Sequence, residues 1–361
     1  MKNLKELVSI QSFDTQQNKQ IIDYLVKKFS PYSEEILRLK NTIDERENLL
    51  IGLNTKLNNV KNAIILAGHI DTVVADEQLY NTDPYTPTII GDKMYGLGTI
   101  DMKSFFACLL DNIEQLKRTN YPIIIAITGD EETTLNGVNI IKKLLLERNV
   151  IPKISIIGEP TDLNICCASK GCSEYLVEAT GKSCHSSMPN NGINANYIIA
   201  RIMLYIEKLC LKIPGTTLTA NVVTGGDKIN IISDKANLKF DLRSDNVKNS
   251  QKIMAYLKKY IRRLEKKYVG SKIMITQTLD IPPLEDKNNL LIDKLCAKFK
   301  LCKNSFLGGC EAGYYQSIGG DAIVFGVGQL SLAHKPNEYV NLCEYEQYKK
   351  LLVEIIEYLG K

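Results

Sequence analysis

The sequence contains no apolar run that approaches the roughly 20 residues needed to span a bilayer. Its first residues place acidic and polar side chains inside any would-be signal core, so they predict two amphipathic helical segments and no secretory peptide. No arginine-rich or aromatic-interleaved segment occurs, and the net charge is only +4. The stretch GLG lacks the further glycine and the lysine of a phosphate loop. We therefore expect neither a membrane, a nucleic acid nor a dinucleotide as a partner.

Cysteine occurs ten times but never as a C-x-x-C pair. A chain of 361 residues can bury enough apolar surface to fold without disulfides, and its length favours two domains. Scattered cysteines in such a chain are typical of buried thiols in a reducing compartment. We expect a cytoplasmic protein.

The first half of the chain alternates apolar runs with helical segments. The runs at 63–69, 122–132 and 153–160 predict buried strands, while 105–118 and 138–147 have the apolar spacing of helices. Continuously apolar strands that alternate with helices are typical of a mainly parallel sheet with helices on both faces. The expected fold class is therefore α/β.

The pattern changes near residue 172, where the apolar residues begin to alternate as in a half-exposed strand. The order strand, helix, two strands, helix, strand that follows is the ferredoxin-like α+β pattern. These elements are expected at 172–182, 195–211, 216–226, 235–244, 247–267 and 272–279. After them the helix and strand alternation returns, with a strand at 321–328 and a closing helix. We predict one α/β domain, 1–171 with 281–361, interrupted by a smaller domain at 172–280.

Only three histidines occur, and the first lies at the end of an apolar run. His69 closes the strand expected at 63–69, and Asp71 lies two positions further on. Residues i and i+2 of an extended chain share a face, so Asp71 can reach the imidazole and hold its tautomer, as is typical of a metal-binding histidine. By itself a histidine at a strand end is more often structural or on the surface.

Carboxylates occupy the corresponding positions elsewhere. Asp101 lies between a glycine turn and a helix, where an N-cap is the alternative role. Asp130, Glu131 and Glu132 follow a fully apolar strand and repel one another unless cations or solvent neutralise them, so a solvated acidic loop is the alternative. Adjacent side chains point to different sides, so one glutamate can bind a metal while its neighbour handles a proton.

Two further residues complete the set, because Glu159 ends the strand 153–160 and His334 follows the strand 321–328. Ligands of open α/β sheets bind at the carboxyl ends of the strands. Two histidines and three carboxylates at one such edge suit a divalent metal, zinc first. One shared aspartate would give a pair of ions on the order of 3.5–4 Å apart.

Six segments resemble, in order, the motifs of the dizinc aminoacylase and acetylornithine deacetylase family, which includes succinyl-diaminopimelate desuccinylase and several carboxypeptidases. They are GHIDTV, YGLGTIDMKSFFA, TGDEET, IIGEPT, CHSSMPNNGINA and AHKPNEYV. The resemblance extends along nearly the whole chain. It implies a catalytic α/β domain with an inserted ferredoxin-like lid through which two copies form a homodimer.

The resemblance also implies two Zn²⁺ ions, with Co²⁺ or Mn²⁺ as substitutes. The implied ligands are His69, Asp101 and Glu159 for one ion and Asp101, Glu132 and His334 for the other. Asp71 would orient His69, and Glu131 would be the general base. His185 would reach into the neighbouring subunit's site and stabilise the oxyanion.

Within the family, segments such as IIGEPTDL and GGCEAGYYQ are most similar to the acetylornithine deacetylase type. The resemblance therefore implies a hydrolase that removes the acetyl group from N-acetyl-ornithine in arginine biosynthesis. The implied substrate-binding residues are Arg243 for the carboxylate with Asn230 nearby, Glu311 for the terminal ammonium, Lys170 and Cys310. A surface salt bridge is the alternative role of Arg243.

Ser104 and Cys310 depart from the family's usual residues, which leaves the substrate less defined than the reaction. Succinyl-diaminopimelate, another N-acyl amino acid or a dipeptide is an alternative substrate for the same chemistry. A third alternative is a non-catalytic family member that only binds metal. Retention of Glu131 beside Glu132 argues against it, because a site that only binds metal needs no base.

Overall fold

The computed structural model describes residues 1–361 and divides into two compact units. The first comprises Met1–Ala168 and Asp286–Lys361, and the second comprises Ser169–Glu285. The sequence placed the corresponding boundaries at 171/172 and 280/281. No helix combines the length and the hydrophobicity that crossing a bilayer requires.

The first unit is built on an eight-stranded sheet with the strand order β1-β2-β6-β3-β7-β14-β8-β13. The strands are β1 (Glu35–Lys40), β2 (Glu47–Leu53), β3 (Lys61–His69), β6 (Ile123–Thr128), β7 (Ile151–Ile157), β8 (Ile165–Ser169), β13 (Lys303–Phe306) and β14 (Asp321–Val324). The central strands β6, β3, β7 and β14 run parallel, whereas β1, β2 and β8 are antiparallel to their neighbours. Every residue of β6 is buried, as expected for a strand covered on both faces. The predicted α/β class with a mainly parallel central sheet is confirmed.

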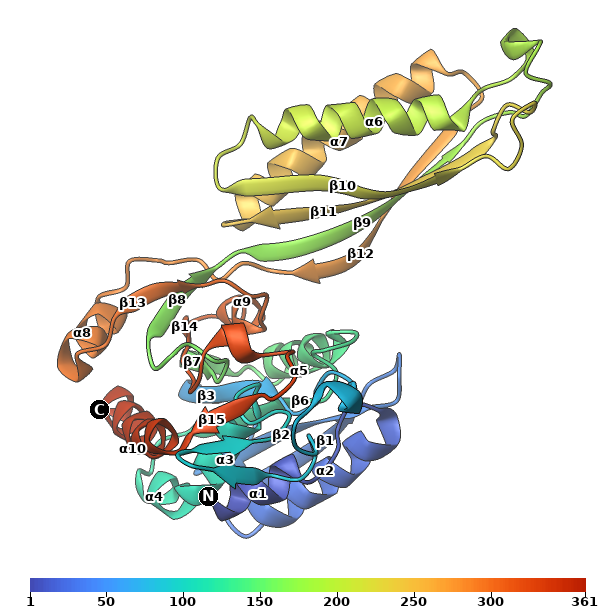
Figure 1. The fold of residues 1–361 in the computed structure, drawn as a ribbon. Helices are drawn as coiled ribbons and strands as arrows, with labels where there is room; N and C mark the ends of the chain where they lie inside the picture. Colours follow the sequence, from blue (N-terminus) through green and yellow to red (C-terminus); the bar gives the residue numbers. More distant parts are fainter. The chain divides into compact units, whose positions relative to one another are not determined.

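Helices and a small second sheet complete this unit (Figure 1). The helices are α1 (Lys2–Val8), α2 (Thr15–Phe29), α3 (Lys103–Asp111), α4 (Ile113–Arg118), α5 (Asn136–Glu147), α8 (Leu290–Phe299), α9 (Ala312–Gln316) and α10 (Leu342–Gly360). The small sheet contains β4 (Thr88–Ile90), β5 (Lys93–Tyr95) and β15 (Tyr339–Asn341). The single helix predicted at 105–118 is broken at Asn112, whose side-chain amide donates to the carbonyl oxygen of Cys108 at 3.0 Å. Such local side-chain bonds compete with the helical ladder.

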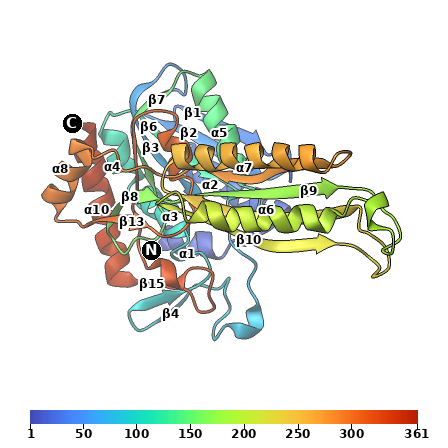
Figure 2. The same cartoon turned by 90° about the horizontal axis from the view of Figure 1, so that it is seen from above.

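The second unit has the predicted ferredoxin-like order. Its elements are β9 (Gly171–Thr180), α6 (Ala195–Cys210), β10 (Thr216–Gly225), β11 (Lys235–Ser244), α7 (Val247–Lys267) and β12 (Lys272–Ile281). The strands form an antiparallel sheet in the order β10-β11-β9-β12. The helices α6 and α7 lie side by side on one face of it (Figures 1 and 2). Burial alternates along β11 because only that face is covered.

Candidate metal centre

Most of the predicted metal ligands lie at the carboxyl ends of three neighbouring strands of the large sheet. His69 is the last residue of β3, Glu131 and Glu132 follow β6, and Glu159 follows β7. Because β6, β3 and β7 are adjacent and parallel, their carboxyl ends meet at one edge of the sheet. Asp101 joins them from the turn before α3, where it does not cap the helix: the N-cap position is Met102.

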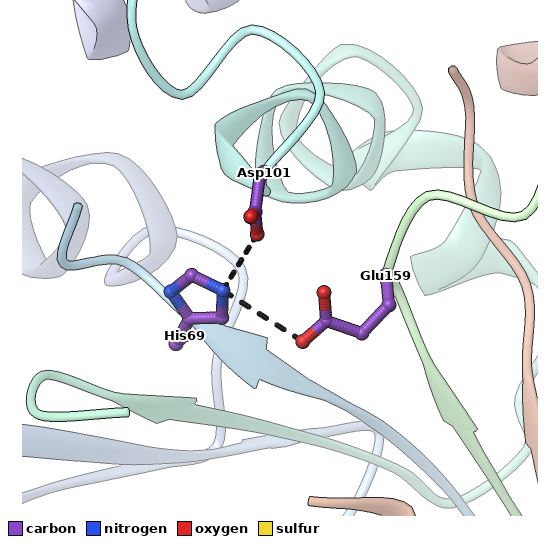
Figure 3. Close-up of side chains that lie close together, drawn as sticks. All are labelled: His69, Asp101 and Glu159. Carbon is purple, nitrogen blue, oxygen red and sulfur yellow. Dashed lines mark hydrogen bonds and ion pairs between the residues drawn. The ribbon is translucent and has the colours of Figure 1, made fainter. Parts of the chain in front are cut away.

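The first group of possible ligands consists of His69, Asp101 and Glu159 (Figure 3). The Nε2 atom of His69 lies 2.9 Å from Oδ1 of Asp101 and 3.7 Å from Oε1 of Glu159. All three side chains are buried. One imidazole nitrogen and two carboxylate oxygens thus converge on one point, an arrangement that can hold a divalent cation.

A second group shares Asp101 with the first and adds Glu132 and His334. The Nε2 atom of His334 lies 3.1 Å from Oδ2 of Asp101 and 2.7 Å from Oε1 of Glu132. Asp101 therefore turns one oxygen toward each histidine, as a carboxylate that bridges two cations does. The structure thus brings together the residues of both ligand sets that the family resemblance implies.

The electrostatics of this centre suit cations. Burial disfavours the charge on Asp101, but hydrogen bonds with His334 and His69 outweigh it and hold the pKa of this carboxyl below its ordinary value. The hydrogen bonds that His334 donates to the carboxylates of Asp101 and Glu132 raise the pKa of His334 to about 10. Burial, followed by the charge of Asp101, raises the pKa of Glu159 well above its usual range. A bound cation would favour the charged carboxylates and neutral imidazoles, so it could replace the protons that these raised pKa values favour.

Asp71 connects His69 to the turn that carries the two glutamates. Nδ1 of His69 lies 2.9 Å from the backbone oxygen of Asp71 and 3.6 Å from its carboxylate. The same carboxylate accepts the backbone N–H groups of Glu131 at 3.2 Å and Glu132 at 3.0 Å. Asp71 therefore contacts both the imidazole, as the sequence predicted, and the turn, which the sequence did not reveal.

Glu131 lies in this turn beside both groups and belongs to neither. Its carboxylate can join His69 and Glu132 in a further cluster of possible ligands. Burial raises the pKa of Glu131 well above its ordinary value, and the neighbouring carboxylates add to this effect while His69 opposes it. A carboxyl group with a raised pKa beside a possible metal site is suited to accept and return a proton.

Sequence reasoning missed Arg46. This residue is 7% exposed, and its Nη1 donates to Oγ1 of Thr133 at 2.8 Å and lies 3.5 Å from the Asp71 carboxylate. Nη2 donates to the backbone oxygen of Phe13 at 2.7 Å. Arg46 thus places a positive charge between the Asp71 carboxylate and the turn that contains Glu131. Nothing in its local sequence indicates this.

Asp130 differs from its two acidic neighbours. Its buried carboxylate accepts the backbone N–H groups of Asn136 at 2.8 Å and Gly137 at 2.9 Å, and it also accepts the side-chain amide of Asn41. It thereby fixes the start of α5. The alternative of a solvated acidic loop is wrong for this residue.

Four predicted residues belong to the second unit. His185 is exposed, and its Nδ1 lies 2.7 Å from Oγ of Ser187. At one end of the β9/β11 pair, Thr180 faces Lys235. Beyond this end, the segment that contains His185 pairs with the segment that contains Asn230. Lys170 is exposed between β8 and β9.

Arg243 lies at the other end of β11, where it faces Cys172 of β9 and its Nε donates to the Asp241 carboxylate at 3.0 Å. Nearly all of β11 separates it from the segment of Asn230, a span of about 27 Å at the ~3.4 Å rise per residue of a strand. The expectation that Asn230 lies near Arg243 is therefore wrong within one chain. Asn230 belongs to INIIS, which precedes β11, and Arg243 belongs to KFDLRS, which ends it. The length of the strand keeps the two residues apart.

Glu311 and Cys310 are buried in the first unit, just before α9. The carboxyl oxygens of Glu311 form no hydrogen bond of good geometry, although the Thr128 side chain lies close enough to oppose the effect of burial, which raises the pKa of this group to about 8. A buried carboxyl group with no well-formed hydrogen bond is rare and calls for an explanation.

Comparison with known proteins gives a match to the model of peptidase family M20/M25/M40 over residues 65–358. The acetylornithine deacetylase of Buchnera aphidicola (subsp. Schizaphis graminum) is 30% identical over 360 residues, which cover 95% of this chain and 91% of that protein. Among solved structures, the aminopeptidase PepT of Bacillus cereus aligns with a TM-score of 0.78 at 22% identity, covering 100% of this chain and 98% of that one. The YXEP protein of Bacillus subtilis, a dinuclear metal-binding peptidase, aligns with a TM-score of 0.72 at 13% identity, covering 99% and 96%.

Proposed function

The chain belongs to peptidase family M20/M25/M40, and we propose that it is a metal-dependent amidohydrolase that removes the acetyl group from N-acetyl-ornithine. The observation that carries this proposal is the pair of ligand groups that share Asp101, with Glu131 beside them. The substrate assignment draws support from the similarity to acetylornithine deacetylase along nearly the whole chain. Participation in arginine biosynthesis would follow from that substrate.

The proposed cofactors are two Zn²⁺ ions, one held by His69, Asp101 and Glu159 and the other by Asp101, Glu132 and His334. Nitrogen and carboxylate donors in sets of three suit zinc, with Co²⁺ or Mn²⁺ as substitutes. A structural neighbour is itself a dinuclear metal-binding peptidase. Bound cations would supply a more acidic water and positive charge for the oxyanion.

The proposed steps for the chain's own residues follow from their positions. Glu131 takes the proton of the attacking water and returns it to the leaving amine. The hydrogen bond from the backbone N–H of Glu131 to the Asp71 carboxylate fixes the backbone of Glu131. His185, an exposed side chain of the second unit, would donate a hydrogen bond to the oxyanion from the partner subunit. An attacking water, a proton acceptor and an oxyanion donor are the groups that amide hydrolysis requires.

Substrate recognition is proposed to use Arg243 for the carboxylate, because a guanidinium can bind it through two parallel hydrogen bonds. Lys170 and Asn230 would add polar contacts. A small substrate cannot touch Arg243 and Asn230 of one chain, since β11 separates them. If both serve one substrate, they come from different subunits. Glu311, with Cys310 beside it, would take the terminal ammonium, which would give this buried carboxyl group a partner of opposite charge.

The compartment proposed is the cytoplasm. All ten cysteines are free thiols, and most are buried or partly buried. A reducing compartment preserves such thiols.

We propose that two copies associate through the second unit. Its edge strand β10 leaves backbone groups unpaired and exposes Val222 and Val223. The neighbouring helix α6 exposes Leu204, and Leu211 just beyond it is also exposed. A second copy that covers these apolar side chains would form a symmetric dimer.

Mixing two inactive variants tests this arrangement. Glu131→Gln and His185→Ala homodimers should each be nearly inactive, and exchange of subunits should restore about a quarter of wild-type activity, because half of the dimers gain one intact site. Sedimentation measures the dimer, and hydrolysis measures the recovery. A fully active monomer, or a mixture that stays inactive although subunits exchange, would contradict the proposal.

The substrate is tested with the purified, zinc-loaded protein and a panel of N-acetyl-ornithine, N-acetyl-citrulline, N-acetyl-methionine, N-succinyl-diaminopimelate and a dipeptide. We expect the highest kcat/KM for N-acetyl-ornithine. A different leading substrate would reassign the pathway and leave the chemistry intact. If nothing is hydrolysed although two metals are bound, the non-catalytic alternative gains weight.

The same panel tests Glu311. If Glu311 binds the ammonium, Glu311→Gln should reduce the preference for N-acetyl-ornithine over N-acetyl-methionine, because the amide removes the ion pair and keeps the volume. An unchanged preference would remove Glu311 from the substrate-binding residues.

A further inference from the structure

Glu338 is a buried carboxylate that none of the steps above uses. It lies four residues after His334 and is 1% exposed. Its Oε2 accepts the backbone N–H of Gly98 at 3.0 Å, and its Oε1 accepts that of Ile100 at 2.8 Å. The N–H of Asp101 also points at Oε1, at 3.3 Å. The Glu338 side chain thus accepts hydrogen bonds from several backbone N–H groups of the turn that ends at Asp101.

The main chain of Glu338 binds the same turn. Its carbonyl oxygen accepts the N–H of Gly96 at 3.0 Å. The residues that follow form β15, which pairs with β5 so that Tyr339 faces Tyr95. The backbone hydrogen bonds between β15 and β5 therefore join the segment after His334 to the segment before Asp101. The bonds of Glu338 extend this connection as far as Asp101.

We propose that Glu338 is a positioning residue, which holds the turn of Asp101 against the segment of His334 and so sets the spacing of these two ligands. This inference rests on the proposed metal-dependent function. It assigns Glu338 no contact with substrate or metal. Groups that orient metal ligands in this way typically contribute 10–100-fold, as an order of magnitude, to metal affinity.

The effect should differ between the two ion positions. His69 and Glu159 are held by the ends of the central strands β3 and β7, whatever happens at Glu338. The position formed by Asp101, Glu132 and His334 depends on the spacing that Glu338 sets. Loss of the carboxylate should therefore weaken the second ion more than the first.

Only a carboxylate offers acceptors in both directions. A glutamine of the same shape can keep its oxygen toward Ile100, but its amide group then faces the N–H of Gly98, donor against donor. Glu338→Gln therefore removes one anchor without emptying the space, whereas Glu338→Ala removes them all. Glu344→Gln is the matched control, because Glu344 also accepts a backbone N–H, that of Gly328 at 2.8 Å, and bonds to no ligand-bearing turn.

The test is equilibrium binding of Zn²⁺, measured by chelator competition on the full-length protein, together with the visible spectrum of the Co²⁺ form. We expect Glu338→Gln to weaken the second ion about 10-fold and Glu338→Ala about 100-fold, with a smaller change for the first ion and none in the control. The Co²⁺ spectrum of the second position should change. Excess metal should restore hydrolysis in Glu338→Gln.

Unaltered affinity for both ions in a folded Glu338→Gln protein would overturn the positioning role. An equal loss for both ions, or the same loss in Glu344→Gln, would also overturn it. Circular dichroism and thermal unfolding of the metal-free proteins establish that the variants fold. A wild-type protein that binds no pair of metals would instead overturn the proposed function, which keeps the two failures apart.

Discussion

Asp101→Asn should cost this protein high-affinity binding of both metal ions and, with them, nearly all hydrolysis. Each carboxylate oxygen faces a different histidine, His69 at 2.9 Å and His334 at 3.1 Å. Asparagine keeps the volume but offers one oxygen and one NH₂ group, so it cannot bridge. The affinity for metal should fall by more than about 100-fold. A residue that only hydrogen-bonds to a metal ligand contributes up to about 100-fold, and a ligand itself should contribute more. Metal content after dialysis and kcat/KM measure the result.

Glu159→Gln is the control that separates bridging from ordinary ligation. Glu159 belongs to the first group only, so this variant should lose one ion and retain the other. If Asp101→Asn and Glu159→Gln each retain one tightly bound ion, Asp101 does not bridge. If Asp101→Asn retains two, the proposed ligand sets are wrong.

The edge of the sheet at which the candidate ligands lie could be predicted from the strand pattern, because the strands fix the positions of the residues at their ends. A residue at the end of a parallel strand has its position fixed by the strand, and β6, β3 and β7 lie next to one another. Three apolar runs were enough to place His69, Glu159 and the carboxylates after β6 at this edge. The choice of Glu132 among those carboxylates, and the division into two ligand sets, came from the family resemblance. The same patterns gave the α/β class and the ferredoxin-like order of the second unit.

What the sequence did not reveal depends on contacts between distant segments. Arg46 reaches Asp71 and the backbone of Phe13, and no local pattern encodes either contact. Asp130 resembles Glu131 in sequence, yet its buried bonds to the start of α5 make it structural. The supposed proximity of Asn230 and Arg243 overlooked a strand length that the sequence itself predicted.

Glu131→Gln should abolish most catalysis while both metals remain bound. Glu131 lies outside the two groups that share Asp101, and its backbone N–H still donates to Asp71 when the side chain changes. Removal of a general acid–base group typically costs roughly 10²–10⁴-fold in rate, so kcat should fall by that order with little change in metal content. Steady-state kinetics and metal analysis on the same sample measure both quantities.

The pH dependence identifies what was lost. Glu131 accepts a proton only when ionised, so wild-type activity should be present above the pKa of this group and be lost as the pH falls through it. Burial and the neighbouring carboxylates raise this pKa in the cation-free centre, and bound cations should lower it toward the acidic range. The residual activity of Glu131→Gln should lack this acidic limb. Glu132→Gln provides the contrast, because it should lose an ion and recover with excess metal. A Glu131→Gln enzyme that recovers in the same way would be a metal-binding variant, and the general base would have to be another group.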